Sequence, residues 1–318
     1  MTAVTRRALL ASMPAIALGG ASAPAQQMKL TLGTAMEGGN VAAYGAALIS
    51  ALRSIDPTLE VRPVPTKGIL DNVSRLDSGE LDIALVFGEV AHELFEGIGR
   101  PVTKLKVVSV MYSTPGMFVV RADARYRRIA DLKGQPVVWN GASSGLAIQA
   151  RYVMDGLDLD IDTDFKAIYT DSLAEGPPMV IGGQAAALWG AGFRWVGFVK
   201  VASGTRGARF VVPTAAEIER IHAKHSFLTR LTVPASLYPG QYEPINTVGS
   251  WSFILARADL DDPIGYRLAA SLYKIERAGT LSRPLAETTV RNTLGAINGP
   301  EMLQPGVARF YKEAELLK

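Results

Sequence analysis

The chain has 318 residues, 48% of them hydrophobic and 20% charged, which is enough apolar material for a sizeable core. Lys and Arg number 33 against 30 Asp and Glu, giving a net charge of +3, and no block of five like charges occurs. This balance disfavours a nucleic-acid partner. The chain has no cysteine, which excludes disulfides, thiolate metal sites and cysteine nucleophiles within it.

The first 25 residues carry the features of an export signal. Arg6 and Arg7 precede an apolar run that reaches Gly20, and a small-residue site, Ala23-Pro24-Ala25, follows. This pattern predicts a cleavable signal peptide over residues 1–25 and a periplasmic mature protein. The paired arginines resemble a twin-arginine signal, and Sec export remains open. Loss of Arg6 and Arg7 lowers the net charge from +3 to +1.

Short β-rich runs then alternate with helical patterns. Continuous or alternating apolar residues predict strands, and helical periodicity predicts the segments between them. The strands are expected at 29–33, 59–64 and 81–86, and the helices at 40–54 and 69–76. This order indicates βαβ units on a largely parallel sheet.

A second set of elements begins near Met117. Its strands are expected at 137–139, 165–169 and 185–189, and its helices at 146–154 and 217–225. The last third contains an apolar strand at 247–256 and two or three closing helices. The simplest α/β architecture has two lobes with a cleft between them. Residues 26–115 and 236–318 form a discontinuous first lobe, and 116–235 form the second.

Two loops that follow predicted strands are candidate binding loops. Ligands of open α/β sheets bind beyond the carboxyl ends of the strands, where helix amino termini present free N–H groups to anions. The candidates are Thr34, Gly38, Gly39, Asn40 and Tyr44 in the first loop, and Asn140, Ser143, Ser144, Gly145 and Leu146 in the second. Thr34 has an equal claim as a helix cap. Trp189 ends a predicted strand, where core packing is the alternative to lining a cleft.

Several segments together resemble the TAXI group of TRAP-transporter solute-binding proteins. They are the glycine-rich opening at 32–44, Ser78 to Ala84, Val120 to Asp123, Ile129 to Gly134, the turn Tyr238-Pro239-Gly240-Gln241, and Ala256 to Leu260. The resemblance implies a type II periplasmic-binding-protein fold without a cofactor or catalytic activity. It also implies delivery of a small carboxylate to a TRAP membrane permease, driven by an ion gradient.

The chain departs from the pattern of this group in two polar positions. Val86-Phe87-Gly88-Glu89 stands where these proteins have a VQSD turn, so Phe87 replaces a ligand-facing glutamine. Leu146 stands where they have a threonine donor. Phe87, Gly88 and Glu89 therefore join the candidate residues. A cleft with these apolar substitutions favours a small organic acid of apolar or aromatic character.

Two other functions remain as alternatives. Gly141-Ala142-Ser143-Ser144-Gly145 matches the G-x-S-x-G pattern of serine hydrolases, with Asp155 or Asp171 as the acid and His222 or His225 as the base. The chain could instead be the receptor of an ABC importer, because type II clamps serve both kinds of transporter. A metal site at His222 and His225 is disfavoured, since their helix is otherwise charged and solvated.

Overall fold

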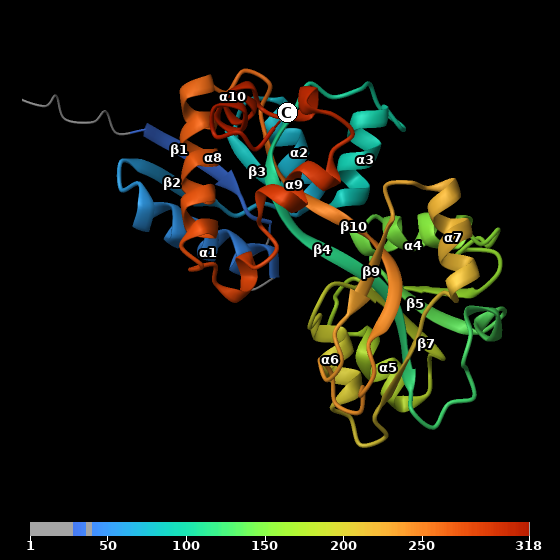
Figure 1. The fold of residues 1–318 in the computed structure, drawn as a ribbon. Helices are drawn as coiled ribbons and strands as arrows, with labels where there is room; N and C mark the ends of the chain where they lie inside the picture. Colours follow the sequence, from blue (N-terminus) through green and yellow to red (C-terminus); the bar gives the residue numbers. More distant parts are fainter. Residues whose placement is uncertain (1–27, 36–39, 318) are drawn as a thin grey trace, which may run out of the picture.

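The computed structural model describes residues 28–35 and 40–317. The predicted signal peptide and the candidate residues Gly38 and Gly39 lie outside this range. Two groups of elements form two lobes, and two long strands run between them (Figure 1). No helix in the described part of the chain is long and apolar enough to cross a bilayer.

The first lobe is built on three parallel strands. These are β1 (Met28–Gly33), β2 (Leu59–Val64) and β3 (Ile83–Val86), with β1 between the other two. The helices α1 (Asn40–Ile55), α2 (Ile69–Asp77) and α3 (Gly88–Glu96) follow them in turn. The expected strands and the first two helices are confirmed. β3 begins at Ile83 rather than at residue 81. Just before it, the carboxylate of Asp82 accepts hydrogen bonds from the N–H and the hydroxyl of Thr31.

The second lobe repeats this arrangement. Its parallel strands are β5 (Pro136–Asn140), β6 (Lys166–Tyr169) and β7 (Ala187–Ala191), with β5 between the other two. The antiparallel strand β8 (Ala208–Val211) pairs with β4. The helices are α4 (Gly145–Asp155), α5 (Gly176–Gly182), α6 (Val196–Ala202) and α7 (Ala215–Lys224), preceded by the 3₁₀ turn η1 (Ile129–Leu132).

The two lobes are joined by β4 (Lys106–Arg121) and β10 (Ile245–Ala256), which pair with each other in antiparallel register. β4 belongs to the sheets of both lobes, and β9 (Thr229–Val233) pairs with β10. β4 starts at Lys106 in the first lobe and runs unbroken into the second lobe, where it pairs with β7 from Gly116 onward. The expected start of the second set near Met117 thus falls within this strand. Sequence reading did not identify the continuous strand, because Ser113-Thr114-Pro115-Gly116 in its middle are residue types typical of a turn.

The carboxyl-terminal helices return to the first lobe. They are α8 (Asp262–Arg277), α9 (Val290–Ala296) and α10 (Pro305–Glu313), with the 3₁₀ turns η2 (Arg283–Leu285) and η3 (Pro300–Met302) between them. Their apolar residues join β1, β3, β4 and β10 in one large core, while the second lobe has cores of its own. The discontinuous first lobe is thus a consequence of where these helices bury their apolar faces.

Candidate functional site

The amino-terminal ends of α3 and α4 meet between the lobes. Phe87 is the N-cap residue of α3, and Ser144 caps α4 by accepting a hydrogen bond from the Ala147 N–H at 3.2 Å. A Cβ atom at Gly145 would lie 2.5 Å from the Phe87 ring and 2.8 Å from Oε1 of Glu89. Only glycine at position 145 permits this approach, so three of the candidate residues lie together at one point of the interface.

Glu89 ends a chain of hydrogen bonds that runs from one lobe to the other. Its Oε2 accepts a hydrogen bond from the Ser250 hydroxyl at 2.8 Å. The Ser250 hydroxyl oxygen lies 2.9 Å from the Thr114 hydroxyl oxygen. The Gln149 amide donates to Thr114 Oγ1 at 3.1 Å and to the Thr114 carbonyl at 3.0 Å. The chain passes through both crossing strands, from α3 in the first lobe to α4 in the second.

The Glu89 side chain is almost completely buried, with 3% of the residue exposed. Burial raises its pKa from 4.5 to about 7, the hydrogen bond from Ser250 acts in the opposite direction, and the Glu93 carboxylate raises it further. Desolvation dominates because the low dielectric of the interior disfavours the charged form. A buried carboxyl with such a pKa, placed between two lobes, is typical of a functional site.

Two further contacts join α3 to the second lobe. The His92 ring stacks on Phe227, with centroids 3.9 Å apart, and Tyr152 donates a hydrogen bond to Glu93 Oε1 at 3.3 Å. Burial lowers the pKa of His92 and raises that of Glu93, so both groups favour their neutral forms more than in water. One face of α3 therefore forms the first lobe's contact with α4 and with Phe227.

The first predicted loop is placed differently from the second. Thr34 is buried, and both its N–H and its hydroxyl donate to the Val64 carbonyl, at 3.1 and 3.4 Å. Tyr44 is buried too, and its hydroxyl lies 2.7 Å from the Thr288 hydroxyl. Asn40 is exposed at the start of α1. Thr34 and Tyr44 thus make internal contacts of the first lobe.

In the second lobe, Asn140 and Trp189 hold the ends of adjacent strands together. Asn140 adopts φ +67°, and its amide donates to the Trp189 carbonyl at 2.9 Å. The Trp189 ring is fully buried against Phe118, with centroids 4.9 Å apart. Its position fits the core-packing alternative. Ser143 is exposed, and the partly buried Leu146 packs against the cores of the second lobe.

Residues 32–314 match the model of the NMT1-like family. The chain belongs to this family. The match covers both lobes and the closing helices, and the likeness to the TAXI group stays a resemblance of sequence segments.

Solved structures similar to this NMT1-like protein are periplasmic or extracellular binding proteins. The probable amino-acid ABC transporter extracellular-binding protein ytmK from Bacillus subtilis is 18% identical, with a TM-score of 0.53, over 81% of this chain and 96% of that one. The periplasmic aliphatic sulphonate binding protein SsuA from Escherichia coli is 16% identical, with a TM-score of 0.52, over 90% and 82%. Tv2483, solved with L-arginine, is 10% identical, with a TM-score of 0.53, over 82% and 91%. These likenesses confirm the type II periplasmic-binding fold.

The geometry contradicts the hydrolase alternative in which Ser143 acts with Asp155 and His225. His225 Nε2 lies 2.6 Å from Asp155, at the carboxyl end of α4, whereas Ser143 precedes the amino end. Eleven residues of helix, roughly 16 Å, separate the ends. Within residues 28–35 and 40–317, no cluster of His, Asp or Glu has metal-site geometry.

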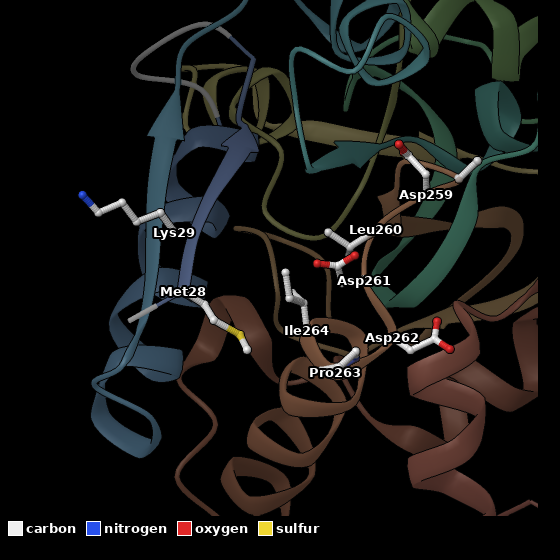
Figure 2. A pocket seen from close by; sticks show the side chains of 9 residues that line it. Met28, Lys29, Asp259, Leu260, Asp261, Asp262, Pro263 and Ile264 are labelled. Atoms are coloured by element: carbon white, nitrogen blue, oxygen red, sulfur yellow. The ribbon is translucent and has the colours of Figure 1, made fainter. Parts of the chain in front are cut away.

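A hollow of about 840 Å³ lies elsewhere, between the start of β1 and the start of α8. Met28, Lys29 and residues 258–264 line it (Figure 2). All of them belong to the first lobe, none is a candidate residue, and Asp259 is paired with Arg257 at 2.6 Å. The hollow is therefore separate from the site between the lobes.

Glu89 was predicted as a candidate ligand-binding residue, whereas its partners Thr114, Gln149 and Ser250 were missed. The hydrogen-bonded pairs are 35 to 161 residues apart in the sequence, and the three partners come from three different elements. The one sequence signal for Ser250 is that Ser250 and Ser252 interrupt an otherwise apolar strand.

Proposed function

We propose that this protein is the periplasmic solute-binding component of an ABC-type importer, and that it captures a small organic acid between its lobes. The observation that carries the proposal is the meeting of the α3 and α4 amino termini across the interface at Gly145. Helix amino termini bind carboxylates through free N–H groups and partial positive charge. Ser144 and Gly145 supply the end of the site that binds the carboxylate, and Phe87 supplies an apolar wall.

Closure is proposed to follow from bending of the two crossing strands. Gly249 pairs with Pro115 where the strands cross, and a Cβ at Gly249 would lie 2.2 Å from the Thr114 carbonyl. The strands are therefore in close contact there, and rotation about this crossing moves the lobes as bodies. On this basis we place the lobe boundaries near 115 and 249 rather than at 236, because Tyr238 and Val248 pack in the cores of the second lobe.

The ABC partner is favoured over the TRAP partner by the ABC transporter named for one of the similar structures. The turn at Tyr238 to Gln241 supports the TRAP alternative. Uptake of a bound solute by membrane vesicles containing the cognate permease distinguishes them. ATP-dependent uptake that survives collapse of ion gradients supports the ABC reading, and gradient-driven uptake without ATP contradicts it.

A substitution at Gly145 tests whether the interface is the binding site. Valine there would collide with Phe87 and Glu89 when the lobes approach, while leaving each lobe intact. Gly295→Val is the matched control, because Gly295 is also helical and has open space around it. Thermal shift of the mature protein is measured with amino acids, C4–C6 dicarboxylates and aromatic acids, since a ligand raises the melting temperature by mass action.

The expected result is that a compound stabilises the wild type and the control, and that Gly145→Val weakens its binding at least tenfold. Small-angle X-ray scattering should show Gly145→Val unable to compact on addition of that compound. Equal binding by Gly145→Val and wild type would place the site elsewhere.

A further inference from the structure

The buried carboxyl of Glu89 has a second consequence for the solute. We propose that Glu89 binds a protonated nitrogen of the ligand, an ammonium, amidinium or guanidinium group. The inference rests on the proposed function, because it specifies the chemistry of the solute held between the lobes. It narrows that solute from an organic acid to one that also carries a positive charge.

The hydrogen bonds around Glu89 end on its carboxyl as an acceptor. Gln149 has only donors on its Nε2, so the Thr114 oxygen accepts from it and the Thr114 hydrogen is free to point toward Ser250. The Ser250 hydrogen then points to Glu89 Oε2. The Thr114 hydroxyl also has the Ser250 carbonyl as an acceptor at 3.0 Å, and Ser250 is the side chain that donates to the carboxyl of Glu89. The chain also fixes the carboxylate in place, since all four side chains are buried.

The part of the chain that the structure describes supplies no positive side chain to balance this carboxylate. Within the described residues, no Lys, Arg or His forms an ion pair with Glu89, and the titratable groups that interact with it are Glu93, Tyr112 and Tyr152. None of these groups is a cation. Above its pKa the Glu89 carboxylate is an unpaired buried charge, which is costly, and a positive group on the solute would balance it.

A solute with a carboxylate alone would fit this site poorly. The α4 amino terminus that attracts the carboxylate begins at Gly145, and Glu89 Oε1 lies against Gly145. Two carboxylates at this distance repel each other in a low-dielectric interface. A positive nitrogen between them turns the repulsion into two attractions. The chemical class that meets both groups is an amino acid or another small zwitterion, with an apolar part against Phe87.

The experiment compares matched pairs that differ in the amino group. Binding of L-phenylalanine and 3-phenylpropionate, L-leucine and 4-methylpentanoate, and 4-aminobutyrate and butyrate is measured at pH 8 by titration calorimetry and thermal shift. Wild type should bind the amine of at least one pair tenfold or more tightly than its partner. Glu89→Gln should weaken the binding of that amine at least tenfold and reduce the preference for the amine over its deaminated partner below about threefold.

Glu96→Gln is the matched control, since it makes the same change in charge on the exposed last turn of α3. It should keep the wild-type preference. The wild-type comparison needs no variant, so the test holds even if Glu89→Gln folds poorly. If the wild type binds the deaminated acids as tightly as the amines, the inference is overturned and the proposed function stands. If neither member of any pair binds, both are contradicted.

Discussion

Replacing Glu89 by glutamine should change how the stability of the ligand-free protein depends on pH. The carboxyl has a pKa of 4.5 in an unfolded chain and about 7 in the folded protein. The folded state therefore binds more protons than the unfolded state between these values, and the free energy of unfolding falls as pH rises from 4.5 to 7. At 1.36 kcal/mol per tenfold change in proton affinity, the loss above pH 7 is about 3 kcal/mol.

Glu89→Gln keeps the size of the side chain and removes this titration, so its free energy of unfolding should lack that decline. The groups around Glu89 are Glu93 and the phenols of Tyr112 and Tyr152. The phenols stay protonated across this range, and Glu93 is common to both proteins, so its contribution cancels to first order in the comparison. Urea unfolding of the mature proteins at pH 5, 6, 7 and 8 measures the difference.

The free energy of unfolding of Glu89→Gln, relative to that of the wild type, should rise steadily from pH 5 to pH 8, by about 2–3 kcal/mol in total. Parallel pH profiles for the two proteins would refute the reasoning, because Glu89 would then have the same proton affinity folded and unfolded. A steeper decline in the variant would refute it as well.

Three other substitutions separate core positions from site positions. Tyr44→Phe should cost about 1 kcal/mol of unfolding free energy in urea, because the Thr288 hydroxyl that Tyr44 bonds donates to the Met111 carbonyl and would lose a donor; solute affinity should not change. Trp189→Ala should cost about 3–5 kcal/mol by the same assay, as expected for a large ring removed from a packed core. Ser143→Ala should leave the rate of p-nitrophenyl ester hydrolysis at the background of the wild type, and a rate that the substitution abolishes would revive the hydrolase alternative.

Much of the element order could be predicted from local patterns. The apolar run that becomes β3 and the amphipathic helices α1, α2 and α7 each carry their own periodicity, and Thr214 with Glu217 forms a capping box at the start of α7. Helix α3 was missed, since Gly88 follows an apolar run directly and resembles a turn residue. The short helices α5 and α6 were missed because seven residues show too little periodicity.

The candidate site was predictable only in part. The Ser144 cap and Gly145 follow from a glycine–serine turn before a helix, and a local signal of this kind survives folding. Thr34, Tyr44 and Trp189 have the residue types of a binding site, yet hydrogen bonds and ring contacts within one lobe account for their positions. Residue type alone does not distinguish a polar group that faces a ligand from one that satisfies a neighbouring strand or helix.

The sequence by itself determined the βαβ alternation and the helix that begins at Gly145, because neighbouring residues set strand, helix and cap formation. The tertiary structure decided that β4 and β10 pair with each other between the lobes and that Glu89 lies buried where the two lobes meet. That burial depends on Thr114, Gln149 and Ser250, which no local pattern relates to Glu89. Burial of Glu89 arises only when the two lobes meet, and the solute chemistry proposed for the site depends on it.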